Sequence, residues 1–133
     1  MSEKFDINNI NKNVYNIGKL TSDIIEILDI ELNEADILIS DDKIKYTEKH
    51  ISDYENYQQY KEMTEKAPEI IAKPDYVGVH PKGQSIEFIK KLDKNILVAV
   101  RISNKNNMWV KSIYPITDSK LNIYIKSGRV KPL

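Results

Sequence analysis

The C-terminal part of the chain alternates apolar and polar residues with the two-residue period of β-strands. From Tyr76 onward four segments follow this pattern: YVGV, SIEFIKKL, NILVAVRIS and MWVKSIYPI. The connections HPKG, DKN and NKNN are short enough for antiparallel hairpins. The pattern predicts a β-meander over residues 76–126, in which Asp118–Lys126 fits a final helix or strand and Gly128 ends it.

Helical spacing begins earlier in the chain, where apolar residues recur from Ile17 to Leu28. Asp23 and Glu26, three positions apart, can serve as a capping pair for this predicted helix. Residues 1–16 are rich in Asn and Lys and lack periodicity. We expect them to form a loose N-terminal arm.

A long polar helix is predicted from about Lys43 to Lys66, after the short apolar strand ADILIS. Asp41 or Asp42 can cap its N-terminus. A short helical turn at 67–72 follows, and Pro74 stops it. Spacings of four, four and three place four side chains on one face of the long helix: Tyr46, His50, Tyr54 and Tyr57.

The predicted helices precede the predicted β-meander in the chain. This order indicates the α+β class, with the N-terminal helices packed on one face of an antiparallel sheet. A chain of 133 residues can bury one core without a disulfide or a structural metal. We therefore expect a single domain over residues 17–133, with a helical part at 17–72 and a β part at 76–126.

Arg101 is a charged residue within the otherwise apolar segment NILVAVRIS. Its position indicates that the face of the strand that carries it is a functional surface. If residues 104–107 form the hairpin loop, the two strands pair in one register. The predicted pairs are Arg101 with Val110, Ala99 with Ser112, and Leu97 with Tyr114.

This register gives the hairpin a polar face and an apolar face. The polar face gathers Arg101, Ser112 and Tyr114, and a turn at 93–95 adds Lys91 and Glu87 to it. The apolar face is expected to pack on the helices. It carries Ile96, Val98, Val100, Ile102, Trp109, Lys111 and Ile113.

Charge is divided unevenly, although 20 Lys and Arg balance 20 Asp and Glu. Residues 1–66 hold 15 acidic and 8 basic residues, whereas residues 67–133 hold 5 acidic and 12 basic residues. A basic half favours a polyanionic partner such as RNA, and attraction between the two halves is the other explanation.

The composition argues against several kinds of site. The absence of cysteine excludes disulfides, thiol nucleophiles and thiolate zinc sites. His50 and His80 are the two histidines, 30 positions apart, and we expect neither a metal nor another cofactor. No apolar run suits a membrane span or a secretion signal, so a cytoplasmic location is expected.

The residue types of the polar face suit RNA cleavage without a metal ion. This reaction needs a base, an acid and fixed cations near the phosphate. His50 can carry the proton, Arg101 can grip phosphate oxygens in a bidentate way, and Ser112 and Tyr114 can orient the phosphate. We expect three further residues to bind the substrate: Tyr46, Lys91 and Lys111.

The segments YNIGKLTSDIIEIL, ILISDDKIKYTEKH, APEIIAKPDYVGV and VKSIYPI occur in an order that resembles a known family. Over about Ile17–Tyr114 the chain looks like the phage-encoded nuclease-like domains grouped with barnase, EndoU, the colicin RNases and RelE. The resemblance implies a metal-independent endoribonuclease of phage or prophage origin that cleaves RNA through its 2′-hydroxyl. It also implies a toxin-like role and a possible inhibitory antidote protein.

The resemblance also implies roles for single residues. His50 matches the histidine that ends the family's helical His-x-x-x-His pattern, and Tyr46 stands in place of the first histidine. Ser112 and Tyr114 match the Ser/Thr and aromatic residues of the last meander strand.

Each candidate residue also has a structural interpretation. His50 can be a partly buried helix residue, Ser112 and Tyr114 can be ordinary strand residues, and Arg101 can pair with Glu87 across the strands. The alternative function is a catalytically inactive RNA- or protein-binding module of phage origin that uses the basic sheet face. A third possibility is a protein that works through protein contacts alone.

Overall fold

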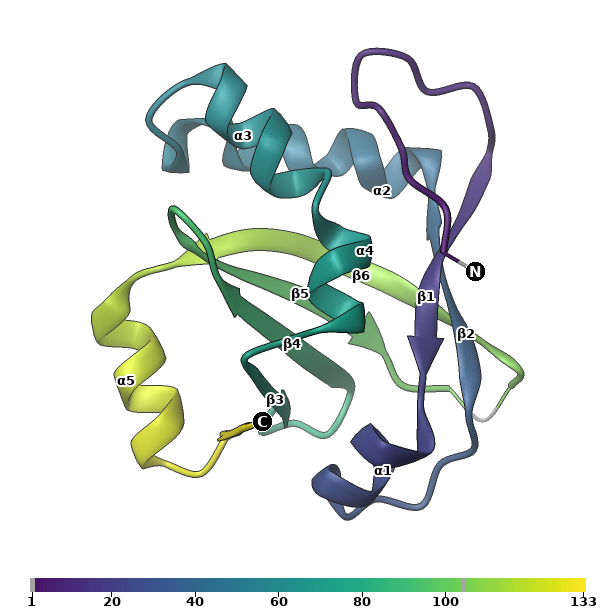
Figure 1. Cartoon of the computed structure of the whole chain (residues 1–133), viewed down its shortest axis with the longest axis vertical. Coiled ribbons are helices and arrows are strands. Elements are labelled where there is room, and N and C mark those ends of the chain that lie inside the picture. The colour runs from purple at the N-terminus through teal and green to yellow at the C-terminus, as the bar shows by residue number, and fades with distance from the viewer. Residues whose placement is uncertain (1, 104) are drawn as a thin grey trace.

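The computed structural model describes residues 2–103 and 105–133 and shows an α+β chain built on one seven-stranded mixed sheet (Figure 1). The strands lie in the order β1-β2-β6-β5-β4-β3-β7. Their bounds are β1 Val14–Leu20, β2 Ala35–Ser40, β3 Tyr76–Val79, β4 Ser85–Lys91, β5 Asn95–Arg101, β6 Asn107–Ile116 and β7 Val130–Pro132. The helices are α1 Ser22–Leu28, α2 Asp41–Tyr46, the 3-10 helix η1 Thr47–Asp53, α3 Tyr57–Thr64, α4 Ala67–Ala72 and α5 Asp118–Lys126.

The predicted meander is confirmed, because β3, β4, β5 and β6 pair antiparallel in chain order. Two additions make the sheet larger and mixed. The antiparallel pair β1–β2 joins the other edge of β6 through a parallel pairing at residues 36–38. Strand β7 pairs antiparallel with β3 at the opposite edge.

The prediction of a helix from Ile17 is wrong, since the chain enters the sheet first and α1 begins only at Ser22. A register shift between Asn16 and Gly18 breaks the period-2 alternation of β1, which hid the strand in the sequence. The cap of α1 is Thr21, whose hydroxyl accepts from the Ile24 amide, and not the pair Asp23 and Glu26.

The segment predicted as a loose arm is packed against the rest of the chain. Phe5 is buried, with its ring centroid 6.0 Å from that of Tyr15. The Ile7 amide donates to the carboxylate of Glu65 at 2.8 Å. Strand β1 then begins inside the predicted arm, at Val14, so residues 17–72 hold two strands as well as helices.

The predicted long helix at 43–66 is three shorter pieces, α2, η1 and α3. Ser40 caps α2 in place of Asp41 or Asp42, because its hydroxyl accepts from the Lys43 amide. The break before α3 lies at Tyr54, whose backbone is extended. Asn56 then caps α3 by accepting from the Gln59 amide at 2.8 Å.

The four residues expected on one helix face therefore do not share one face, although Tyr46 and His50 line the same cavity. Tyr54 is buried with its ring edge against Tyr60, whereas Tyr46 and Tyr57 are exposed. Each helix among the described residues is too short or too polar to cross a membrane.

Helices cover both faces of the sheet, which corrects the expectation of a one-sided arrangement. The main core lies between the sheet and α1 to α4, and Figure 1 shows α4 across the front of the sheet. On the other face, Leu121 and Tyr124 of α5 pack on Ile89 and Leu97. Helix α5 thus covers part of the face that was expected to be polar.

Close approach of two strands at one edge gives a stability prediction. A Cβ atom at Gly78 of β3 would clash with the carbonyl oxygen of Arg129, next to the pairing of Gly78 with Val130. The variant Gly78→Ala is expected to lose about 1–3 kcal/mol of unfolding free energy, because the backbone must shift to relieve the overlap. An unchanged denaturant midpoint would contradict this prediction.

Candidate active site

The candidate site lies where the two halves of the chain meet along β6. Strand β2 pairs only with residues 107–109 of this ten-residue strand, and α2 and η1 lie against β6 as well. A cavity of about 310 Å³ opens between these elements. It is lined by Lys43, Tyr46, Lys49, His50, Arg101, Lys111, Ser112 and Tyr114.

A β-bulge in β6 decides which side chains reach this cavity. The predicted pairs of Ala99 with Ser112 and of Leu97 with Tyr114 are confirmed. Beyond the bulge, however, Arg101 pairs with Trp109, so the predicted pairing with Val110 is wrong. Arg101 and Ala99 point to the same side of β5, so Trp109 and Ser112 share that side.

Trp109 and Lys111 were expected on the apolar face, and this is wrong. Trp109 faces the same side as Arg101 and is exposed, while Val110 is buried in the main core. Lys111 is the additional residue of the bulge, and its exposed side chain lines the cavity. The bulge therefore adds a cation to the site.

His50 is held in place by two contacts. Its Nδ1 atom lies 3.0 Å from Oδ2 of Asp53, and its ring stacks on Tyr114 with 5.4 Å between centroids. Among the described residues, its second ring nitrogen has no hydrogen-bond partner. A Nδ1–H that donates to Asp53 leaves Nε2 as a free acceptor, the form required of a base.

The two tyrosines of the cavity differ in acidity. Burial raises the pKa of Tyr114 to about 12, with the nearby charge of Glu87 as the next cause. Tyr114 therefore remains a neutral phenol near pH 7. In contrast, a hydrogen bond from Lys49 lowers the pKa of Tyr46, with the charges of Lys49, Lys43 and Lys111 as further causes.

Lysine side chains surround Tyr46. Lys49 donates to its hydroxyl at 2.6 Å, and the Nζ atoms of Lys43 and Lys49 lie 4.8 and 4.2 Å from the ring centroid. Sequence reasoning missed Lys43, Lys49 and Asp53. Their spacing of three residues from Tyr46 or His50 was the available signal, since such pairs are neighbours on a helix.

Arg101 is exposed and belongs to no ion pair among the described residues. The alternative interpretation, in which Arg101 pairs with Glu87, is wrong, because Arg129 holds that carboxylate through two hydrogen bonds of 2.8 and 2.7 Å. Of the described residues that line the cavity, four are Lys or Arg and none carries a carboxylate. The site therefore suits an anion such as a phosphate.

A scan against protein-family models matches residues 15–123 to the family described as phage-Barnase-EndoU-ColicinE5/D-RelE like nuclease3. The chain belongs to this nuclease-like family, PBECR3. The resemblance inferred from the sequence is thereby confirmed. Searches of curated proteins and of solved structures find no match. All eight residues that line the cavity fall inside the PBECR3 match.

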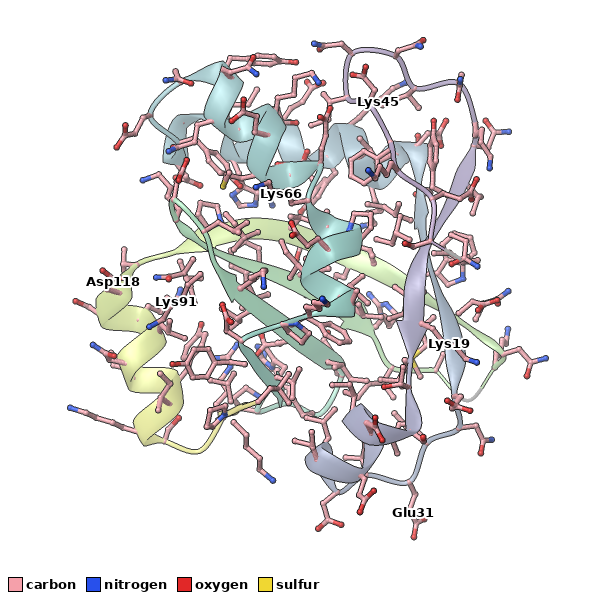
Figure 2. The ribbon with its side chains drawn as sticks, viewed as in Figure 1. Lys19, Glu31, Lys45, Lys66, Lys91 and Asp118 are labelled. Atoms are coloured by element: carbon pink, nitrogen blue, oxygen red, sulfur yellow. The ribbon has the colours of Figure 1, made fainter. Side chains whose placement is uncertain are left out.

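One predicted residue of the PBECR3 domain, Lys91, lies outside this cavity. It lines a second cavity of about 860 Å³ together with Asp53, Asn95 and Asp118. Figure 2 shows Lys91 beside Asp118 at the start of α5. Within residues 2–103 and 105–133, no three His, Asp or Glu side chains are grouped so as to hold a metal ion.

Proposed function

We propose that the chain is an endoribonuclease that cleaves RNA by attack of a 2′-hydroxyl on the adjacent phosphorus, without a metal ion. The observation that supports this most is the position of His50. It faces a cavity lined by four cations, with Nδ1 held by Asp53 and Nε2 free to act as a base. Membership of a nuclease-like family adds support.

Each residue of the cavity takes a role that its chemistry allows. Nε2 of His50 removes the proton of the 2′-hydroxyl. Arg101 and Lys111 hold the non-bridging phosphate oxygens and stabilise the added negative charge. Ser112 and Tyr114 donate hydrogen bonds to the same phosphate. DNA lacks the attacking hydroxyl and is not a substrate.

The proposal is tested with an RNA oligonucleotide and a matched oligonucleotide that carries a 2′-deoxynucleotide at the cleaved position. Purified protein is expected to cut the RNA to a 2′,3′-cyclic phosphate in the presence of a chelator, and to leave the deoxy-substituted oligonucleotide intact. Cleavage of the deoxy-substituted oligonucleotide, or complete loss of cleavage on chelation, would contradict the proposal.

Arg101 gives a second prediction at the same site. The variant Arg101→Ala is expected to lower the cleavage rate roughly 10²–10³-fold, because a fixed donor to the transition-state charge is lost. Arg101→Lys should recover only part of this rate, since Lys cannot bind a phosphate in a bidentate way. Lys105→Ala, an exposed residue outside the cavity, is the control. Equal cleavage rates in all variants would show that Arg101 takes no part in the reaction.

A catalytically inactive RNA-binding module is the second candidate. His50 is the one histidine that lines the cavity in the described part of the chain, whereas acid-base cleavage needs two proton carriers. An inactive module would bind RNA with strong salt dependence and yield no cyclic phosphate.

A further inference from the structure

Cleavage by a 2′-hydroxyl needs two proton transfers, and His50 accounts for one of them. A base takes the proton of the attacking hydroxyl, and an acid gives a proton to the departing 5′-oxygen. Because a ribose alkoxide is a poor leaving group, the acid contributes strongly to the rate. The remaining hydroxyl groups of the cavity belong to Ser112, Tyr114 and Tyr46.

Two of these three hydroxyls are poorly suited to act as an acid. Burial holds Tyr114 as a neutral phenol with a pKa of about 12, so its proton is retained more strongly than that of an ordinary tyrosine. Ser112 carries an aliphatic hydroxyl, which is a much weaker acid than a phenol. Neither has a cation placed to stabilise its conjugate base through a hydrogen bond among the described residues.

Tyr46 has such a cation. The ammonium group of Lys49 donates to its hydroxyl oxygen at 2.6 Å. Lys43 and Lys49 both lie close to its ring, and Lys111 adds a further positive charge. All these charges favour the phenolate that forms when Tyr46 gives up its proton. The side chain is 44% exposed, so a bound substrate can reach the hydroxyl.

We propose that Tyr46 is the general acid of the RNA cleavage, and that Lys49 positions its hydroxyl and stabilises its phenolate. This inference rests on the function proposed above and assigns the second proton carrier. The site then contains two hydrogen-bonded pairs of side chains on neighbouring turns of α2 and η1. Asp53 supports the base His50, and Lys49 supports the acid Tyr46.

The step balances in protons and bonds. Nε2 of His50 takes the 2′-hydroxyl proton while the 2′-oxygen forms its bond to phosphorus. The bond from phosphorus to the 5′-oxygen breaks, and that oxygen receives the proton of Tyr46. The products are a 2′,3′-cyclic phosphate, a free 5′-hydroxyl, a protonated His50 and a phenolate beside the Lys49 ammonium. Solvent then restores both groups.

The test compares normal RNA with an RNA whose scissile 5′-oxygen is replaced by sulfur. A thiolate leaves without being protonated, so the sulfur substrate needs the base but not the acid. Tyr46→Phe is expected to lower cleavage of normal RNA roughly 10²–10⁴-fold and to cleave the sulfur substrate within a few-fold of the unaltered protein. His50→Ala should lose the cleavage of both substrates.

Tyr57→Phe is the matched control for Tyr46→Phe. Tyr57 is 45% exposed, and no lysine lies over its ring in the described part of the chain. Its hydroxyl donates to Asn8 and does not line the cavity. The control should cleave both substrates at the rate of the unaltered protein.

The pH profile tests the role of Lys49 separately. A general acid must be protonated, so the alkaline limb of the rate profile reports its pKa. Lys49→Met removes the ammonium group that stabilises the phenolate, so the pKa of Tyr46 rises. We expect the alkaline limb to move to higher pH and the maximum rate to fall. Lys45→Met is the control, because Lys45 is exposed on α2 outside the cavity (Figure 2).

The outcomes separate this inference from the proposed function. If the unaltered protein cleaves RNA and Tyr46→Phe cleaves normal RNA equally fast, the proposed function stands and the assignment of Tyr46 is overturned. Equal losses on the normal and sulfur substrates would also overturn it, because they indicate a role in binding or folding. If the unaltered protein cleaves neither substrate, the proposed function fails and the acid role fails with it.

Discussion

RNA cleavage is expected to fall roughly 10²–10⁴-fold when His50 is replaced by Ala. Among the described residues that line the cavity, His50 carries the one imidazole, and two neighbours, Asp53 and Tyr114, hold its ring. Single-turnover rates at saturating protein concentration measure the chemical step apart from binding. RNA affinity should change little, because the four cations of the cavity remain.

His80→Ala is the matched control for this prediction. His80 lies after β3, where its Nδ1 accepts from the Lys82 amide, and it does not line the cavity. A third variant, Asp53→Asn, should lower the rate less than His50→Ala, because it weakens the orientation of the ring and keeps the ring itself. Full cleavage by His50→Ala would remove the histidine from the mechanism.

Arg129→Met is expected to cost roughly 3–5 kcal/mol of unfolding free energy, because it leaves the Glu87 carboxylate buried without a partner. Glu87 is 1% exposed and accepts two hydrogen bonds from Arg129, and the guanidinium also lies 3.8 Å from the ring centroid of Tyr124. Denaturant unfolding followed by circular dichroism measures the loss. A stable domain has about 5–15 kcal/mol in total, so the effect is large.

Two further variants make this prediction specific. Arg101→Met should leave the unfolding free energy nearly unchanged, since Arg101 is exposed and has no carboxylate partner among the described residues. The double variant Glu87→Leu with Arg129→Met should recover most of the loss, because it removes the buried charge together with its partner. A double variant as unstable as Arg129→Met alone would contradict the explanation.

The β-meander could be predicted from the sequence because its strands alternate and its loops are short. The N-terminal half could not be predicted as well, and the reasons are local. The register shift in β1 removed the alternation that identifies a strand, and apolar residues from Ile17 onward then matched helical spacing by coincidence. Asn56 and Gln59 match the capping pattern, and this pair was the available signal for the break before α3.

The pairing of Ala99 with Ser112 was predicted correctly, and it places Ser112 on the side of the sheet that carries Arg101. The bulge that adds Lys111 to this face could not be read from the sequence, because one additional residue leaves no mark on a short apolar pattern. The count of charges in each half of the chain did not indicate that Lys43 and Lys49 contribute to the site. They lie in the acidic half of the chain, yet α2 and η1 carry them to the cavity.

Strand β6 lies between β2 and β5 in the sheet, so it brings late residues of the chain beside early ones. The cavity between them can therefore form only after both parts have been synthesised. The ribosome makes residues 43–50 early and residues 101–114 late. A nascent chain that ends before β6 lacks Lys111, Ser112 and Tyr114 of the cavity, so the proposed cleavage cannot begin at that stage. The cavity therefore forms only after residues 107–116 have been made and have paired with β5.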